Sequence, residues 1–118
     1  MQPTTKVSQR TVATSSGEAA TILAFAGDIS SASRDPLLNA YHGLNGTGKI
    51  LLDFTGVDYI NSSGIAIIIQ MLLEASKAGT QSIGIFGLSP HFRKVFTMVG
   101  INKYAALHNN EGEALAAK

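Results

Sequence analysis

The chain has 118 residues, 45% of them apolar, and a formal net charge of +1. This predicts one folded domain over residues 1–118, and the small charge argues against nucleic-acid binding, which needs clustered Lys and Arg. The sequence has no cysteine, which excludes disulfides, thiol catalysis and thiolate metal sites. Its longest apolar stretch, Ile65 to Ile69, is too short to span a bilayer, and the first residues lack a signal-peptide core. A soluble cytoplasmic protein without membrane insertion is therefore expected.

Two strands and a helix are predicted in the first third of the chain. Lys6 to Ala13 alternates weakly between polar and apolar residues, and Thr21 to Ala26 forms a second strand that Gly27-Asp28 ends. The turn between these strands pairs them as a β-hairpin. Asp35 is then expected to be the N-cap of a helix with Pro36 at its first position.

The middle of the chain predicts a buried strand followed by the longest helix. Ile50 to Phe54 is a nearly continuous apolar run, typical of a strand covered on both faces in a parallel sheet. Thr55 to Asn61 is interpreted as a turn, and the helix runs from about Ser63 to Ala78. At helical spacing, its core-facing residues are predicted to be Ile65, Ile68, Ile69, Leu72 and Ser76.

The last third predicts two more strands and two more helices. The first is a second central parallel strand over Gln81 to Phe86, followed by a helix that begins at Ser89-Pro90 and ends at a left-handed Gly100. A short strand within Tyr104 to Leu107 comes next, and then a helix that begins with a capping box of Asn110 and Glu113. The apolar residues of the Ser89-Pro90 helix are Phe92, Val95, Phe96 and Val99. The order β-β-α-β-α-β-α-β-α predicts an α/β fold: a mixed, mostly parallel sheet with an N-terminal hairpin and about four helices.

Patterns associated with catalysis have simpler explanations here. Gly43 to Lys49 matches the letters G-x-x-x-x-G-K of a phosphate-binding loop, but Ile50 follows in place of Ser or Thr, and a strand follows in place of a helix. A flexible turn is the better interpretation. The three histidines are too scattered for metal-ligand spacing. Asp53 and Asp58 are candidates for a carboxylate pair, but Asp53 is better explained as a strand-end or turn acceptor. No enzymatic activity and no cofactor are expected.

One segment, Asp58 to Ile65, places an amide and two hydroxyls where a buried strand gives way to the longest helix. Asn61, Ser62 and Ser63 can cap the helix, because its first N–H groups lack intrahelical partners. The same N–H groups and the helix dipole also favour an anion, or a phosphate carried by one of the serines. Local physics leaves both interpretations open.

The stretch Leu51 to Ile65 (LLDFTGVDYINSSGI) resembles the signature of STAS domains, the sulfate-transporter and anti-sigma-factor-antagonist family. The resemblance covers about Thr21 to Leu115 and agrees with the predicted element order. Further similar pieces are Phe25 to Ile29, Gly79 to Gly87, Val99 to Tyr104 and Glu113 to Leu115.

The resemblance implies a partner-switching protein, an anti-sigma-factor antagonist. In such antagonists a serine at the start of the signature helix is phosphorylated by an anti-sigma factor that is a serine kinase, and a PP2C-type phosphatase removes the phosphate. The unphosphorylated form binds the kinase and frees the sigma factor. By position, the phosphoacceptor would be Ser62, with Ser63 as the alternative, and Gly64 would admit a partner's backbone.

Two departures from the family keep a second function open. The family usually has Asp where this chain has Asn61, and commonly Asp where it has Ser30. Both favour the alternative of a scaffold or transport-complex STAS domain that binds partners without a phosphorylation switch. The sequence also leaves open whether the chain is a monomer or a homodimer.

A partner-facing surface is predicted around the serine pair. At 100° per residue, Ile67 and Met71 lie on a different flank of the helix from the predicted core residues, and therefore in solvent unless a neighbouring helix covers them. The predicted surface consists of Asp28, Ser30, Asn61, Ser62, Ser63, Gly64, Ile67 and Met71.

Overall fold

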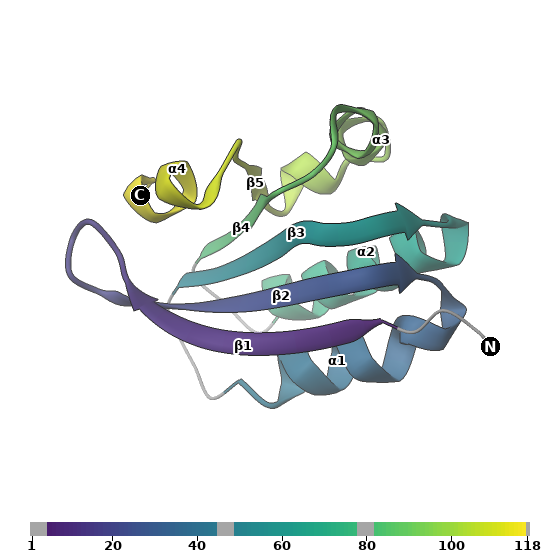
Figure 1. Cartoon of the computed structure of the whole chain (residues 1–118), viewed down its shortest axis with the longest axis horizontal. Helices are drawn as coiled ribbons and strands as arrows, with labels where there is room; N and C mark the ends of the chain where they lie inside the picture. Colours follow the sequence, from purple (N-terminus) through teal and green to yellow (C-terminus); the bar gives the residue numbers. More distant parts are fainter. Residues whose placement is uncertain (1–4, 45–48, 78–81, 118) are drawn as a thin grey trace.

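The computed structural model describes residues 5–44, 49–77 and 82–117. Five strands and four α-helices lie within this part of the chain, in the predicted order (Figure 1). The elements are β1 Lys6–Ala13, β2 Ala19–Ile29, α1 Arg34–His42, β3 Lys49–Ile60, α2 Ser62–Lys77, β4 Ser82–Phe86, α3 Pro90–Met98, β5 Ala106–Leu107 and α4 Glu111–Ala116, with short 3₁₀ turns at Ser31–Ser33 and Ile101–Lys103. No helix among the described residues is long and apolar enough to cross a membrane.

The strands form one mixed sheet in the order β1-β2-β3-β4-β5. β1 and β2 pair as the predicted antiparallel hairpin, and the remaining neighbours are parallel. Helices α1 and α2 lie behind the sheet in Figure 1, and we call the sheet face that they cover the helix face. The opposite face, the open face, is covered by α4 only at one end.

Apolar side chains on both faces explain why β3 and β4 are central. Leu52 and Phe54 of β3 join the main core beneath α1 and α2, whereas Leu51 points to the open face and packs with Phe86 and Ala114. Leu51, Leu52 and Ile85 are buried and Ile83 is half-buried. The prediction of two central parallel strands buried on both faces is confirmed.

Two strands extend further than predicted. β2 continues past Gly27-Asp28 to Ile29, and β3 continues to Ile60 through a segment for which the sequence predicts a turn. The two ends pair with each other, since Asp28 lies opposite Tyr59 and Ile29 opposite Ile60. The pairing of β2 with β3 shifts register on either side of Gly27, whose φ of +86° lies in the left-handed region that glycine adopts easily. The glycine is therefore a bend within β2 and does not end the strand. Pairing between distant segments therefore overrode the local turn signals.

The start of α1 also differs from the prediction. The 3₁₀ turn at Ser31–Ser33 precedes the helix, so α1 begins at Arg34, and neither Asp35 nor Pro36 marks its first residue. Pro36 lies within the first turn, where proline is tolerated because the N–H that it lacks would have no intrahelical partner. The glycine-rich loop predicted over Gly43 to Gly48 lies partly outside the described residues, as do Ala78 and Gln81.

The predicted helix termini in the last third are confirmed, but one apolar face is not. Ser89 accepts a hydrogen bond from the Phe92 N–H, and Gly100 is left-handed at φ +88°. Of the apolar residues predicted for α3, only Phe96 is fully buried and Val99 is exposed. The helix packs against the sheet through its middle, where Phe96 meets Phe54 at a centroid distance of 5.7 Å.

The start of α4 follows the predicted cap with one change of partner. Asn110 accepts a hydrogen bond from the Glu113 N–H at 2.8 Å. The Glu113 carboxylate accepts from the Asn109 N–H and not from Asn110. The cap therefore uses one residue more than a standard capping box.

His108 predicts a pH dependence of stability. Its side chain is 11% exposed and packs against Gly84, whose Cβ position would lie 3.1 Å from His108 Cδ2. Burial lowers the pKa of His108 despite the nearby Glu113 carboxylate. The unfolded chain then binds a proton more readily than the folded protein, so the free energy of unfolding falls as the pH drops from about 7.5 through about 6.5 and on to the lowered folded pKa.

Denaturant melts of the wild type and of His108→Gln at these pH values test this prediction. The variant should lose less stability between neutral and mildly acidic pH than the wild type does. Equal losses in the two proteins would contradict a contribution from His108.

Candidate functional site

Asn61 connects the end of β2 to the start of α2. Its backbone N–H donates to the Ile29 carbonyl at 3.1 Å, and its carbonyl accepts from the Ile65 N–H at 3.0 Å. Its side-chain Oδ1 accepts from the Gly64 N–H at 2.8 Å, which makes Asn61 the N-cap of the helix. The predicted capping role of Asn61 is therefore confirmed, and its side-chain acceptor is engaged within the domain.

Because Asn61 caps the helix, neither of the two serines that follow it serves as the N-cap. Ser62 and Ser63 are the first two residues of α2, and both are exposed. Within the described part of the chain, neither side-chain hydroxyl nor backbone N–H of these serines has a hydrogen-bond partner. The helix carries no acidic residue in its first turn. Two exposed hydroxyls thus stand beside two free donors at the positive end of a helix dipole.

The turn after β2 lies at the same end of the sheet as the start of α2. Ser30 caps the 3₁₀ turn: its side chain accepts from the Ala32 N–H, and its own N–H donates to Ser33 Oγ at 2.9 Å. Ser33 is only 1% exposed, and its hydroxyl is also bonded to Thr5 Oγ1. Thr5 in turn donates to the Asp28 carbonyl at 2.7 Å. Asp28 and Ser30 remain half-buried, so both are partly accessible beside the start of α2.

Sequence reasoning missed the structural role of Ser33 and Thr5. The spacing of Ser30 and Ser33, three residues apart, was a signal for the cap. Nothing local in the sequence pointed to Thr5, because its partners lie 23 and 28 residues away.

Gly64 faces the interior of the protein, which corrects the prediction that it admits a partner's backbone. It is buried, and a Cβ built on it would lie 2.8 Å from the Ile29 carbonyl carbon, with the Ile29 oxygen closer still. The close approach that needs glycine is therefore that of α2 to the end of β2.

The family model described as Mlab, STAS domain matches residues 12–109, which is most of the chain. The chain belongs to the STAS domain family. This confirms the family predicted from the signature stretch. No curated protein matches the sequence.

Solved structures with the same fold include antagonists and part of a transporter. An anti-sigma factor antagonist from Mycobacterium paratuberculosis is 15% identical, with a TM-score of 0.73, 93% of this chain covered and 92% of that one. The antagonist SpoIIAA in its unphosphorylated form is 17% identical, with a TM-score of 0.63 and 92% coverage of each chain. The murine anion transporter Slc26a9 is 16% identical, with a TM-score of 0.65 over 80% of this chain and 17% of the transporter. At these identities the likeness establishes the fold.

The prediction that Ile67 and Met71 face solvent on this STAS domain is wrong. Ile67 is 5% exposed and Met71 is 1% exposed, and both belong to the main core. Helix α1 covers this flank of α2, where Arg34 donates to Gln70 Oε1 at 2.7 Å. A second cross-link joins His42 Nε2 and Glu74 Oε1 at 3.0 Å.

The core-facing side of α2 is rotated by roughly 80° from the predicted one, counted at 100° per residue. Ile68 and Leu72 are buried as predicted, whereas Ile65 and Ile69 are only half-buried and Ser76 is exposed. The solvent side of the helix is therefore a strip that begins at the serine pair. We call it the α2 strip, and it consists of Ser62, Ile65, Ala66, Ile69 and Leu73.

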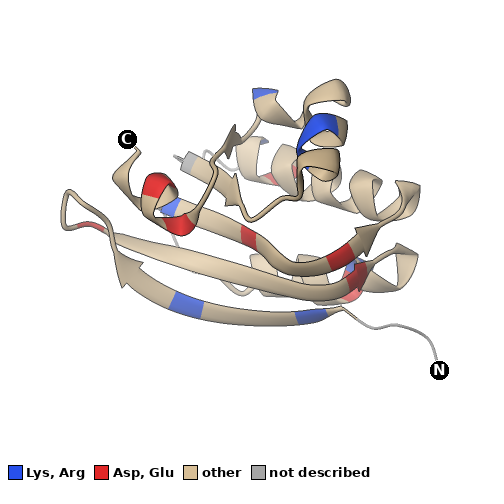
Figure 2. Cartoon of the chain, turned by 45° about the horizontal axis from the view of Figure 1, so that its top comes forward, with Lys and Arg blue, Asp and Glu red and all other residues tan. Residues whose placement is uncertain are grey.

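The carboxylate pair considered in the sequence does not form. Asp53 and Asp58 are five positions apart on the same extended strand, about 16 Å at the usual rise per residue. Asp53 instead accepts a hydrogen bond from the Thr55 N–H at 2.9 Å, as a local acceptor. Within residues 5–44, 49–77 and 82–117, no three metal-ligating side chains gather at one place. Lys and Arg are interspersed with Asp and Glu in the view of Figure 2.

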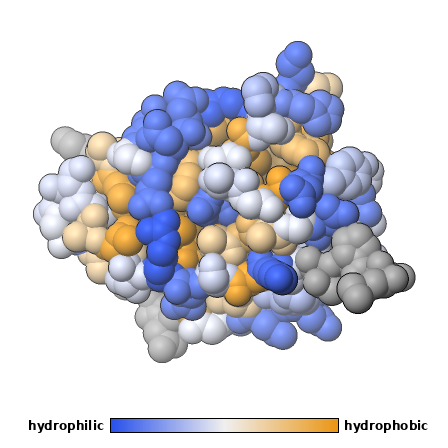
Figure 3. All heavy atoms as spheres, viewed as in Figure 1, coloured by the Kyte–Doolittle hydropathy of each residue, from blue (hydrophilic) through white to orange (hydrophobic). Residues whose placement is uncertain are grey.

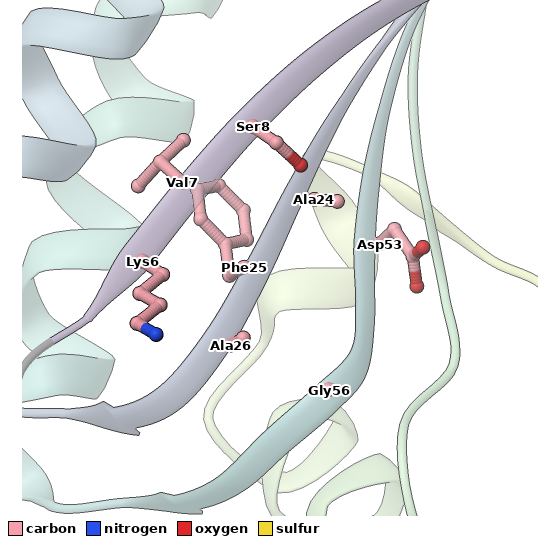
Figure 4. A pocket seen from close by; sticks show the side chains of 8 residues that line it. All are labelled: Lys6, Val7, Ser8, Ala24, Phe25, Ala26, Asp53 and Gly56. Carbon is pink, nitrogen blue, oxygen red and sulfur yellow. The ribbon is translucent and has the colours of Figure 1, made fainter.

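A shallow pocket of about 360 Å³ lies away from the serine pair, where the open face is left uncovered by α4. It spans β1, β2 and β3, and it is lined by Lys6, Val7, Ser8, Ala24, Phe25, Ala26, Asp53 and Gly56 (Figure 4). The face drawn in Figure 3 mixes hydrophilic and hydrophobic residues over this region. Half of its lining residues are Ser, Ala or Gly, and its polar side chains are those of Lys6, Ser8 and Asp53, the last already accepting a hydrogen bond from the Thr55 N–H.

Proposed function

We propose that this STAS domain is an anti-sigma-factor antagonist that binds an anti-sigma serine kinase and is released when Ser62 is phosphorylated. The observation that carries the proposal is the state of Ser62, which is exposed at the first position of α2. Asn61 supplies the cap, and neither the hydroxyl nor the N–H of Ser62 has a hydrogen-bond partner among the residues that the structure describes. Ser63 shares this environment and is the alternative acceptor. The fold of solved antagonists, one of them SpoIIAA in a phosphorylated form, supports the same role.

In this proposal the catalysis belongs to the partners. The kinase transfers the γ-phosphoryl group of ATP to Ser62 Oγ and releases ADP and the hydroxyl proton. A PP2C-type phosphatase hydrolyses the phosphoester to restore the serine and release inorganic phosphate. The chain itself acts by binding, without a cofactor and without nucleic acid, in the cytoplasm where the kinase finds ATP.

The partner-facing surface is revised by the burial of Gly64, Ile67 and Met71. Asp28 and Ser30 remain from the turn after β2, together with the serine pair at the start of α2. The α2 strip replaces the two buried side chains as the apolar part of the surface, since it is accessible and continuous with Ser62. Asn61 supports this surface by its cap.

Phosphorylation assays test the proposal directly. The protein is incubated with ATP and the anti-sigma kinase of its own organism, and the phosphate is located by mass spectrometry. We expect phosphate on Ser62, and its loss in Ser62→Ala but not in Ser63→Ala. Phosphate on Ser63 alone would identify the alternative acceptor, and binding without any phosphate would reject the switch.

A charge at position 62 is expected to abolish kinase binding without unfolding the domain. A negative charge at the exposed start of a helix is stabilising by roughly 0.3–1 kcal/mol, so Ser62→Asp should melt within a few degrees of the wild type. Calorimetric titration with the kinase should show that binding is lost in Ser62→Asp. It should be retained in Ser62→Asn, because asparagine has nearly the same shape as aspartate but carries no charge. A Ser62→Asp protein that unfolds would contradict this mechanism.

A second candidate function is a STAS domain that joins a scaffold or transport complex without a switch. The likeness to one part of the Slc26a9 transporter favours it, as does the neutral Asn61 beside the serine pair. On that hypothesis Ser62→Asp and Ser62→Asn would bind a partner equally well.

A further inference from the structure

The outer edge of β1 is a long and regular strand edge. β1 is the first strand of the sheet, and its eight residues pair with β2 without a register break, from Lys6 opposite Ala26 to Ala13 opposite Ala19. None of the described residues pairs with its other side, and in Figure 1 α1 lies next to that side only over the N-terminal half of the strand. The sheet's opposite edge, β5, has only two residues. The backbone N–H and C=O groups along one side of β1 are thus available to another strand.

β1 lacks the features by which proteins usually block such edges. Common protections are proline, a bulge, a short strand or free charged side chains. The strand contains no proline and no bulge, and its only charges are Lys6 and Arg10. The Arg10 guanidinium is held by Glu111 of α4, with Nη1 3.2 Å from Oε2. Lys6, at the very start of the strand, is the only charged side chain on the edge without such a described partner.

We propose that two copies of this chain associate through β1, antiparallel, about a two-fold axis perpendicular to the sheet at Gln9. In an antiparallel pair, the side chains of two directly opposed residues lie on the same face of the sheet. The two-fold axis must therefore pass between two copies of the same residue, and the choice of that residue defines the register. Centring on Arg10 places the two Arg10 side chains opposite each other, and centring on Ser8 places Lys6 opposite Arg10. Centring on Gln9 places no like charges together and pairs residues 6–12 of both copies, a longer stretch than centring on Val7 or Thr11 would pair. It places Ser8 opposite the other copy's Arg10 and Val7 opposite its Thr11.

The position of α1 is compatible with this two-fold axis. α1 lies beside the N-terminal half of β1, where Val7 packs against the main core (Figure 1). Gln9, Thr11 and Ala13, on the same face of the strand, are exposed. The axis at Gln9 places each copy's α1 over the other copy's exposed half, and joins the two sheets into one. Ser62 and Ser63 are not part of this edge, so the dimer is independent of the proposed switch.

Sedimentation velocity from about 1 μM to about 1 mM tests the association. We expect a monomer–dimer equilibrium that weakens at least tenfold in Gln9→Lys, because two ammonium groups then meet on the axis. Asn102→Lys is the matched control, since it makes the same change of charge at an exposed residue remote from β1 and should leave the equilibrium unchanged. A protein that stays monomeric, or a dimer unaffected by Gln9→Lys, would overturn the proposal.

Disulfide trapping tests the register, because the natural sequence has no cysteine. Opposed residues of an antiparallel pair have Cα atoms about 4.5–5.5 Å apart, within reach of a disulfide. Gln9→Cys should therefore form a covalent dimer on mild oxidation. Thr11→Cys should not, since each Thr11 lies opposite Val7 of the other copy. Efficient cross-linking through position 11 and not through position 9 would refute the Gln9-centred register.

Discussion

Replacing Gly64 with alanine is expected to lower the free energy of unfolding by roughly 2–3 kcal/mol. In most helices this change adds stability, because alanine has the higher helix propensity. Here the new methyl group would lie 2.8 Å from the Ile29 carbonyl carbon and 2.9 Å from Ile29 Cγ2. The backbone at Ile29 is held by the Asn61 N–H, so it cannot move away without breaking the connection between β2 and α2. Urea denaturation monitored by circular dichroism measures the effect.

Gly112→Ala is the matched control for Gly64→Ala. Gly112 is an exposed residue of α4, and its nearest neighbour to an added Cβ is Asn110 Oδ1 at 3.4 Å, an ordinary contact. Its substitution should leave stability within about 0.5 kcal/mol of the wild type. If Gly64→Ala were equally mild, α2 would not be pressed against β2 at this position.

Met71→Ala is expected to cost about 3 kcal/mol, because it removes a fully buried side chain and leaves a cavity beneath α1 and α2. Leu73→Ala, two residues further along the same helix, should cost less than about 1 kcal/mol because Leu73 is 38% exposed. The comparison reports directly which side of α2 faces the sheet. Equal and small effects at both positions would restore Met71 to the partner surface and contradict the rotation of the helix described above.

The rotation of α2 illustrates what hydrophobic periodicity can and cannot predict. The sequence placed the helix correctly to within a residue at its start, because apolar residues at helical spacing follow a capping residue. Isoleucine, methionine and leucine occupy more than half of its circumference, so several rotations bury a similar apolar area. The rotation is selected by its neighbours: Gly64 against Ile29 on one side, and the Arg34–Gln70 and His42–Glu74 contacts on another.

The signature stretch made the serine pair predictable, but the structure assigns the roles within it. From sequence, Asn61, Ser62 and Ser63 were equivalent candidates for the N-cap. The side-chain oxygen of Asn61 takes that place because the backbone N–H of the same residue donates to the Ile29 carbonyl, a contact between residues 32 positions apart. One acceptor suffices to cap the Gly64 N–H, and both serine hydroxyls are without a hydrogen-bond partner in the described part of the chain.

The sequence by itself determined the fold class, the element order, the STAS family and the segment that carries the site. These depend on periodicity, local capping residues and a contiguous signature, all of which act over a few neighbouring residues. Only the tertiary structure decided the lengths of β2 and β3, the inward direction of Gly64, and the burial of Ile67 and Met71. It also decided that β1 lies at the edge of the sheet, where none of the described residues pairs with its outer side. Each of these depends on which distant segment lies alongside, and such contacts leave no periodic signal in the chain.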